Sequence, residues 1–469
     1  MTARGTLSGL VLIATTGLWC SACESGHAGQ GPGDTDAVGA DPASEGSAAP
    51  TPGPSVGMGL DGGLSPAVNR DTSPKAATGD ASVASALPMD VRCQADAAVP
   101  QRTDFAQAGP HSVATLDVTF EDTSRPIAAT DKHAAAPSRT LVTTIYYPAA
   151  GDAPLGGSAP LASGGPFPML MYSHGYSSSR DEATRVANRA TSYGYIVVAP
   201  DFPLTNLQAN GGAPDIDDAA NQPADVSFLI DKLLAFSKDS QHVLANAVDE
   251  ARIGALGVSL GGLTTLLVSF HPRFHDARIK AAMPIAALSG FFAPGFYHTR
   301  ELPVLLVHGD MDAIVNYELN ARRAFTRALP NARLITIAKG THAAFGAQFD
   351  PSLAPILNAL IAPANADPGN PDGVGCGAVG ATLQMTGPEF ITALGDAKDF
   401  INVDEAKLLP CEGDEYTHPA IDPDEQEDIV LRSAIPFFDA HLGSTPDTRQ
   451  DGCRYLLHEL PKHDSVKLE

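Results

Sequence analysis

The chain has few basic side chains for its length. Its 30 Lys and Arg residues stand against 54 Asp and Glu residues, which gives a formal net charge of −24 over 469 residues. The basic residues form no cluster, and a protein that binds nucleic acid needs such a cluster to neutralise phosphates. Attraction to an anionic lipid surface needs one too. We therefore expect no nucleic-acid partner and no charge-driven membrane binding.

Long apolar runs are also absent after the N-terminus, where no stretch approaches the roughly 18 residues that span a bilayer. Residues 1–22 differ, because a basic residue, an apolar run and small residues follow one another there as in a signal peptide. The small residues before Cys23 resemble a bacterial lipoprotein processing site, although Cys20 stands where Leu is usual. We expect export, with Cys23 lipidated at the cell surface or outer envelope. Plain secretion or a periplasmic location is the alternative.

Apart from Cys20 and Cys23 at the expected processing site, the cysteines show no CxxC pair, and no His-rich spacing is present, so we expect no zinc site and no other metal. Processing of the N-terminus would leave four cysteines, enough for two disulfides in an exported protein. These are Cys93, Cys376, Cys411 and Cys453. Three connectivities are open, and we favour the pairing of Cys376 with Cys411 because both flank one insertion.

Residues 23–100 contain few large apolar side chains. Gly, Ala, Pro, Ser, Asp and Thr make up almost all of this segment. Such a composition cannot bury enough apolar surface to offset the entropy of ordering. We interpret it as a disordered tether that would hold a folded domain away from the membrane.

From residue 114 onward, strand-like and helix-like patterns follow one another. Two β-rich runs, over residues 114–122 and 139–148, predict an antiparallel pair. Short apolar strands then alternate with amphipathic helices. This order predicts an α/β fold with a mostly parallel central sheet covered by helices on both faces. In such sheets, functional residues gather at the carboxyl ends of the strands.

A candidate nucleophile lies between one of these strands and the next helix. Gly257, Ser259 and Gly261 form a G-x-S-x-G pattern after an apolar strand and before a helix-like stretch. The pattern alone is a weak signal in a chain with 44 glycines, and its alternative is a glycine-rich turn with an ordinary serine. The strand, turn and helix around Ser259 favour a nucleophile whose hydroxyl attacks an acyl carbon.

A serine nucleophile needs a general base and an acid that orients the base. Asp312 follows the strand at residues 303–309, and His342 follows the strand at residues 332–338. We expect Asp312 to be the acid, and Asp310 is the alternative, with hydrogen bonding to turn amides as its other role. His308 lies inside a buried strand pattern and is expected to pack in the core.

Acyl transfer also needs two amide donors for the oxyanion. The residue after the nucleophile, Leu260, supplies one donor. Tyr176 follows the strand at residues 167–174 and is the candidate for the other, with Gly175 allowing the turn. His174 is interpreted as a structural residue of this turn.

With SHGY, GVSLGG, HGDMD and GTH in this order, the chain resembles the α/β-hydrolase superfamily. More narrowly it resembles the bacterial predicted dienelactone hydrolases, which are related to platelet-activating-factor acetylhydrolase, over residues 105–345. Cutinases that degrade polyesters and chlorophyllase-type esterases share much of this layout. The resemblance implies an α/β-hydrolase fold without cofactor. Because dienelactone hydrolase uses a cysteine, Ser259 favours carboxyl-ester hydrolysis.

Two features depart from a compact esterase. Residues 350–423 separate the catalytic domain, 101–349 and 424–469, into two segments, and we expect this insertion to form a cap or lid. Its residues 389–409 carry helical apolar spacing, which argues against a disordered loop. The second feature is an aromatic loop in which Phe291 and Phe292 are candidates to line an apolar substrate site. Core packing is the alternative for both rings.

The sequence therefore predicts an exported serine esterase with a Ser259–His342–Asp312 triad and an acyl-enzyme intermediate. Its expected partner is a small or polymeric ester, without a protein partner. Cutinase-like polyesterase activity and phospholipid acetylhydrolase activity are alternatives within enzymes. A non-catalytic binding protein with a hydrolase fold is the alternative outside them.

Overall fold

The computed structural model describes Cys93, Ala95 and residues 100–151, 159–328, 332–346, 362–377, 389–406 and 409–469. The expected signal peptide, residues 1–22, the candidate lipidation site Cys23 and nearly all of the expected tether lie outside the described residues. Among the helices that are described, none combines the length and the apolar character that crossing a bilayer requires.

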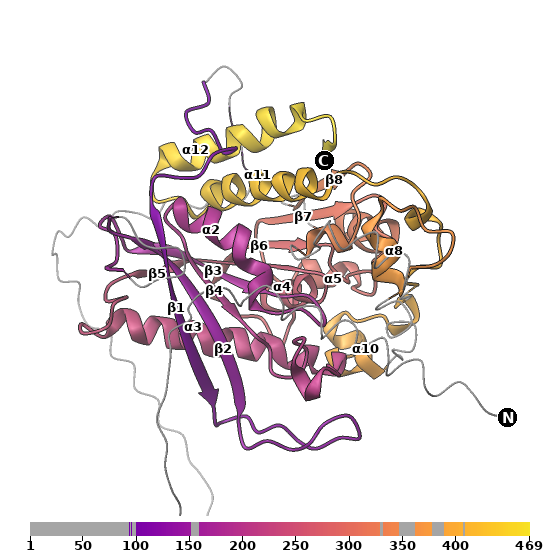
Figure 1. Ribbon diagram of the computed structural model, residues 1–469. Helices are drawn as coiled ribbons and strands as arrows, with labels where there is room; N and C mark the ends of the chain where they lie inside the picture. The colour runs from indigo at the N-terminus through magenta and orange to yellow at the C-terminus, as the bar shows by residue number, and fades with distance from the viewer. Residues whose placement is uncertain are drawn as a thin grey trace, which may run out of the picture. The chain divides into compact units, whose positions relative to one another are not determined.

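A nine-stranded sheet forms the centre of the described part of the chain, in the order β1-β2-β4-β3-β5-β6-β7-β8-β9 (Figure 1). The strands are β1 Ser112–Asp122, β2 Arg139–Ala149, β3 Phe167–Ser173, β4 Ile196–Pro200, β5 Val248–Val258, β6 Ile279–Ile285, β7 Val304–Gly309, β8 Ala332–Ile337 and β9 Val466–Leu468. β1 and β2 are antiparallel, as expected, and β2 is antiparallel to β4. From β4 through β8 all neighbours are parallel, and β9 closes the edge antiparallel to β8.

The helices connect the strands and cover both faces of the sheet. They are α2 Thr184–Ser192, α3 Gln222–Lys238, α4 Leu260–Phe270, α5 Pro294–Tyr297, α6 Arg323–Arg327, α8 Pro371–Gly375, α10 Glu389–Leu394, α11 Pro423–Leu442 and α12 Pro446–Arg454. One apolar layer contains the buried side chains of α3 and α4, and the other contains those of α2 and α11 (Figure 1). Strands β3, β4 and β7 are buried along their whole length, as expected for a sheet covered on both faces. The expected α/β-hydrolase fold is confirmed.

Two disulfides tie distant segments to this core. Cys376 pairs with Cys411, the pairing favoured from the sequence, and Cys93 pairs with Cys453. Cys93 is buried, and Ala95 accepts a hydrogen bond from His458 at 3.0 Å. The folded part therefore begins before residue 101, where the sequence analysis placed the end of the tether. Composition did not reveal this, because the contact depends on a cysteine 360 positions away.

The insertion is less helical than its apolar spacing predicts. Within residues 389–409 the only regular α-helix described is α10, and Gly395 at φ +143° ends it. Short 3-10 turns follow, and Phe400 adopts a left-handed φ of 62°. The apolar residues after Gly395 are thus presented by turns and not by a continued helix.

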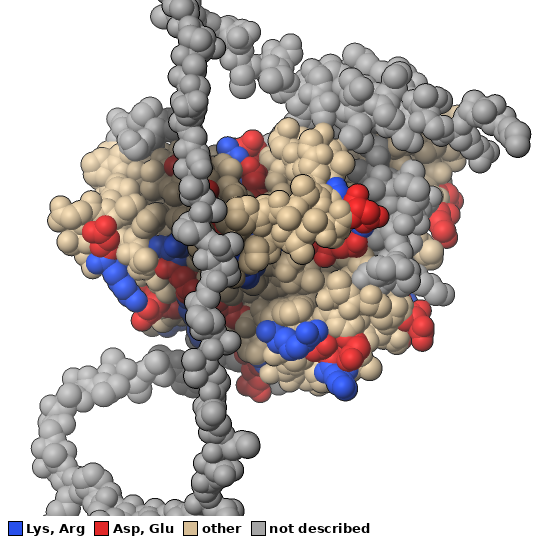
Figure 2. All heavy atoms as spheres, turned by 90° about the horizontal axis from the view of Figure 1, so that it is seen from below, with Lys and Arg blue, Asp and Glu red and all other residues tan. Residues whose placement is uncertain are grey.

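Charged side chains on the face seen in Figure 2 are interspersed. Lys and Arg lie beside Asp and Glu on this face and do not gather in a patch of one sign. Ion pairs of this kind are described in the chain, for example between Arg278 Nη2 and Asp276 Oδ2 at 2.6 Å.

Candidate active site

Ser259 occupies a sharp turn between the end of β5 and the start of α4. Its φ of 56° and ψ of −114° lie in a region that non-glycine residues rarely adopt. The backbone N–H of Ser259 donates to Ile285 O at 2.9 Å and holds the turn against β6. Strain of this kind persists where the surrounding structure enforces it, as at functional sites. The turn presents the hydroxyl at the carboxyl edge of the sheet.

The two glycines of the motif are required by close packing. A Cβ on Gly261 would lie 1.8 Å from Ser173 O, and a Cβ on Gly257 would lie 2.4 Å from the same atom. Ser173 ends β3, so α4 can approach the sheet this closely only where the side chain is absent. This contact explains why the serine turn carries glycine on both sides.

Replacing Gly261 by alanine is expected to lower the free energy of unfolding by about 1–3 kcal/mol, because the added methyl group must displace the end of β3. The measurement is urea denaturation followed by circular dichroism. Gly346→Ala is the matched control, since Gly346 has φ −87° and the nearest atom to its added Cβ lies 3.8 Å away. Equal stability of both variants would contradict the packing argument.

Asp312 and His342 are in direct contact. Asp312 Oδ2 accepts a hydrogen bond from His342 Nδ1 at 2.7 Å, and Asp312 is buried. Asp310, the alternative acid, accepts instead from the backbone N–H of Lys339 at 2.7 Å. Of the two aspartates, Asp312 is therefore the one that can orient the imidazole.

Opposite charges set the protonation of this pair. Burial alone would raise the pKa of Asp312, but His342 and His308 outweigh it and lower that pKa to about 2. Burial alone would lower the pKa of His342, but Asp312 and two further carboxylates, Asp372 and Glu182, raise it. The acid therefore stays ionised at neutral pH, and the imidazole is a stronger base than an isolated histidine.

His308 also contacts the acid, which the sequence analysis did not predict. The ring is fully buried in β7, as expected for a core residue, but Nε2 lies 2.7 Å from Val315 O and 3.0 Å from Asp312 Oδ2. Since both neighbours are acceptors, Nε2 carries the proton. The other carboxylate oxygen, Asp312 Oδ1, accepts from the N–H groups of Ile314 and Val315. The carboxylate is thus fixed from several sides.

The candidate oxyanion donors flank Ser259. Leu260 is the first residue of α4, where backbone N–H groups have no partner within the helix. Tyr176 follows the turn at Gly175, and its hydroxyl donates to Pro214 O at 2.8 Å. Within the described ranges its backbone N–H makes no hydrogen bond. His174 has the structural role expected for it, because Nδ1 donates to Gly175 O and Nε2 accepts from Phe202 N–H.

Glu182 is a buried carboxylate beside this turn that the sequence analysis missed. It accepts hydrogen bonds from the Tyr172 hydroxyl at 2.9 Å and from the Gly175 N–H at 3.1 Å. Burial raises its pKa to about 7. A Cβ on Gly175 would lie 3.4 Å from Glu182 Oε2 and 3.6 Å from Ser259 Cβ, so the three residues are close neighbours.

The structure does not join all three predicted triad members. In the described part of the chain Ser259 and His342 share no hydrogen bond, although Ser259 neighbours Glu182 and the charge of Glu182 acts on His342. Hydrogen bonds between catalytic groups are often long in the absence of substrate, so the lack of a hydrogen bond between Ser259 and His342 is compatible with catalysis. The catalytic roles of these residues stay predictions.

Phe291 and Phe292 lie in a packed aromatic cluster. Both rings are buried, and the Phe292 ring stacks on Phe296 at 3.7 Å between centroids. The insertion covers them, because Phe291 O accepts from Asn402 N–H and Phe292 forms a β-bridge with Ile401. This burial matches core packing, the alternative stated for these residues, and a role in lining the substrate site stays a prediction.

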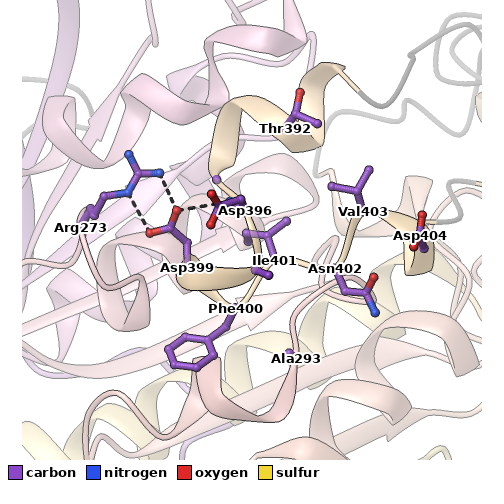
Figure 3. A pocket seen from close by; sticks show the side chains of 12 residues that line it. Arg273, Ala293, Thr392, Asp396, Asp399, Phe400, Ile401, Asn402, Val403 and Asp404 are labelled. Atoms are coloured by element: carbon purple, nitrogen blue, oxygen red, sulfur yellow. Dashed lines mark hydrogen bonds and ion pairs between the residues drawn. The ribbon is translucent and has the colours of Figure 1, made fainter.

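Two residues that follow α4, Arg273 and His271, also anchor the insertion. Asp399 accepts hydrogen bonds from Arg273 Nε at 2.8 Å and Nη2 at 2.9 Å, across a surface groove of about 790 Å³ (Figure 3). His271, at the end of α4, contacts Leu394 O through Nε2 at 2.9 Å. The described turns of the insertion are therefore fixed to the body of the fold.

Among the residues that the structure describes, no group of three or more His, Cys, Asp or Glu side chains is arranged to hold a metal ion. The expectation of a site without metal or cofactor stays a prediction.

The sequence is similar to two groups of known proteins. The model of the chlorophyllase family matches residues 137–290. A cutinase, est2 of Thermobifida alba, is 24% identical over 189 residues, which cover 40% of this chain and 51% of the cutinase. Over these parts of its length the chain is similar to esterases. It spans about half the length of the curated relative it matches.

Among solved structures, a ferulic acid esterase from Streptomyces cinnamoneus resembles the chain with a TM-score of 0.44 and 18% identity. The match covers 76% of this chain and 97% of that one. The narrower resemblance to predicted dienelactone hydrolases and platelet-activating-factor acetylhydrolase stays a prediction.

Proposed function

We propose that the protein is an exported serine hydrolase that cleaves carboxylic esters. The observation that carries the proposal is the buried contact of Asp312 with His342 at the edge of the sheet that presents Ser259. The matches to the chlorophyllase family and to a cutinase support ester hydrolysis in general. The two disulfides are compatible with export.

In this mechanism the neutral imidazole of His342 takes the proton of the Ser259 hydroxyl as the oxygen attacks the ester carbonyl. Asp312 holds Nδ1–H, so Nε2 is the atom that accepts the proton. The N–H groups of Leu260 and Tyr176 stabilise the oxyanion, and loss of one such donor costs about 3 kcal/mol of barrier. His342 returns the proton to the leaving alcohol, and water then releases the acyl group by the same steps in reverse.

The substrate class is tested by a series of p-nitrophenyl esters from acetate to longer acyl chains, together with one insoluble polyester. Release of acid from the polyester would support a cutinase-like activity, and turnover restricted to short esters would support a small-molecule esterase. Absence of turnover on every member, with folded protein, would contradict the proposal.

The aromatic loop gives a sharper version of this experiment. If Phe291 lines the acyl site, Phe291→Ala is expected to impair long-chain esters more than acetate. If the ring only packs in the core, the variant is expected to lose about 3–5 kcal/mol of stability and to affect all chain lengths alike. Chain-length profiles at a temperature where the variant is folded separate the two roles.

We also propose that Cys23 carries a lipid and that the following segment tethers the catalytic domain to the envelope. Mass spectrometry of the mature N-terminus tests this, since a lipidated Cys23 and a free secreted N-terminus differ in mass.

A further inference from the structure

The helix α8 belongs to the insertion (Figure 1). Asp372 lies on this helix and is fully buried. Its side chain accepts three backbone hydrogen bonds from two different loops. Oδ2 accepts from the N–H of Ala313 at 2.9 Å and of His342 at 3.0 Å, and Oδ1 accepts from Ala343 N–H at 2.7 Å. The carboxylate of Asp372 therefore links Ala313, which follows the candidate acid Asp312, to the candidate base His342.

The chain around Asp372 holds this carboxylate in place. Asn370 caps α8 by accepting from the Asp372 N–H at 2.9 Å, and its amide donates to Glu415 O and His418 O. The disulfide from Cys376, which follows α8, leads to Cys411, whose N–H donates to Ala313 O at 2.6 Å.

α8 also packs tightly on the acid loop. A Cβ on Gly375 would lie 2.6 Å from Ile314 Cδ1, so the end of the Ile314 side chain packs directly against this glycine. The insertion thus contacts the loop after β7 at Ala313 and Ile314.

Burial of an ionised carboxylate is unfavourable unless hydrogen bonds compensate it. Burial and the charge of Asp312 raise the pKa of Asp372 to about 6, so it is mostly ionised at neutral pH. The backbone hydrogen bonds described for this carboxylate come from the loop after Asp312 and from the loop of His342. We therefore expect its buried charge to stabilise the positions of these two loops.

We propose that Asp372 is a positioning residue that fixes the Asp312 loop and the His342 loop relative to each other. The inference rests on the proposed function and deepens it, because it gives the insertion a role in the reaction. The imidazole of His342 must lie within hydrogen-bonding distance of the serine hydroxyl, and a displacement of about 1 Å can lower the rate about 100-fold.

Asp372→Asn is the main test. It keeps the size of the side chain but replaces one acceptor by an amide donor, so at least one loop contact is lost. We expect kcat for a p-nitrophenyl ester to fall by about 10- to 100-fold with little change in KM. Rates are normalised to the sites that react with a fluorophosphonate, so that misfolded protein does not contribute.

The pH profile gives a readout that a purely structural role would not move. His342 faces the carboxylates of Asp312, Asp372 and Glu182, which all raise its pKa. Removing one negative charge lowers the pKa of His342, so the acid limb of kcat/KM should move to lower pH in Asp372→Asn. Asp372→Glu keeps the charge but displaces the contacts, so it should lower kcat with the limb near the wild-type pH.

Asp396→Asn is the matched control. Asp396 lies in the same insertion, and its side chain accepts from backbone N–H groups of its own turn, those of Lys398 and Asp399. Wild-type kcat and pH profile are expected for it.

Wild-type kcat per labelled site and an unmoved acid limb in Asp372→Asn would overturn the positioning role and leave the proposed function standing, because Ser259-dependent turnover is measured in the same assay. If Asp372→Asn does not fold, Asp372→Glu decides: a lowered kcat supports the role and a wild-type kcat overturns it. Absence of Ser259-dependent turnover in the wild-type protein would instead overturn the proposed function, and the positioning role with it.

Discussion

Replacing Ser259 by alanine is expected to lower kcat for p-nitrophenyl ester hydrolysis by at least about 10⁴-fold, because no other group can form the acyl-enzyme. The substitution removes one oxygen atom and leaves the backbone turn unchanged. Its backbone hydrogen bond to Ile285 O also stays, so the fold should be intact. Initial rates of p-nitrophenolate release measure the effect.

Ser240→Ala is the matched control, since Ser240 is an exposed serine between α3 and β5. It should retain the wild-type rate. Near-wild-type activity of Ser259→Ala, with both variants equally folded, would contradict the assignment of the nucleophile.

The second large effect concerns the acid. Asp312→Asn is expected to lower kcat by about 10⁴-fold, because an amide no longer holds the imidazole of His342 in the tautomer that accepts the serine proton. Asp310→Asn is the control, because the Asp310 carboxylate accepts from the backbone N–H of Lys339 and has no hydrogen bond to His342 among the described contacts. A large loss in Asp310→Asn with an active Asp312→Asn would reverse the assignment.

The same variants make a prediction for the pH dependence. His342 must be neutral to act as a base, so kcat/KM of the wild-type enzyme should fall as the pH is lowered through the pKa of His342. Because Asp312 is among the groups that raise this pKa, the acid limb should lie above the ordinary histidine value of about 6.5. In Asp312→Asn the limb should move to lower pH. A profile measured at constant ionic strength checks both statements.

Much of the fold could be predicted because its strands are continuous apolar runs separated by helical periodicity. The strands expected at residues 114–122, 139–148, 167–174, 303–309 and 332–338 agree within two residues with β1, β2, β3, β7 and β8. The C-terminal edge strand β9 is only three residues long, and α12 follows α11 after a short connection, so neither gives a strong periodic signal. Apolar spacing after Gly395 predicted a longer helix than the structure has, because spacing does not reveal a backbone that turns left-handed.

The candidate triad residues could be located for a different reason. Ser259, Asp312 and His342 each follow a strand of a parallel sheet, and such strand ends share one edge. The residues that support them do not follow this rule. Glu182 comes from a 3-10 turn and Asp372 from the insertion. Gln426 comes from α11, and its side-chain amide accepts from the N–H of Thr341 and donates to the carbonyl oxygen of Thr341.

The contacts of Asp372 and Gln426 with the candidate site depend on tertiary packing between residues 29 to 85 positions apart, for which one sequence contains no pattern. His308 illustrates the same limit. Its burial could be inferred from the strand around it, but its contact with Asp312 depends on how the following loop folds back.

The most direct test of the central claim is intact-mass analysis after reaction with a fluorophosphonate, followed by peptide mapping. A serine activated by His342 and Asp312 is expected to gain one adduct, located on Ser259, and Ser259→Ala is expected to gain none. A wild-type protein that stays unmodified, or an adduct on another residue, would contradict the account.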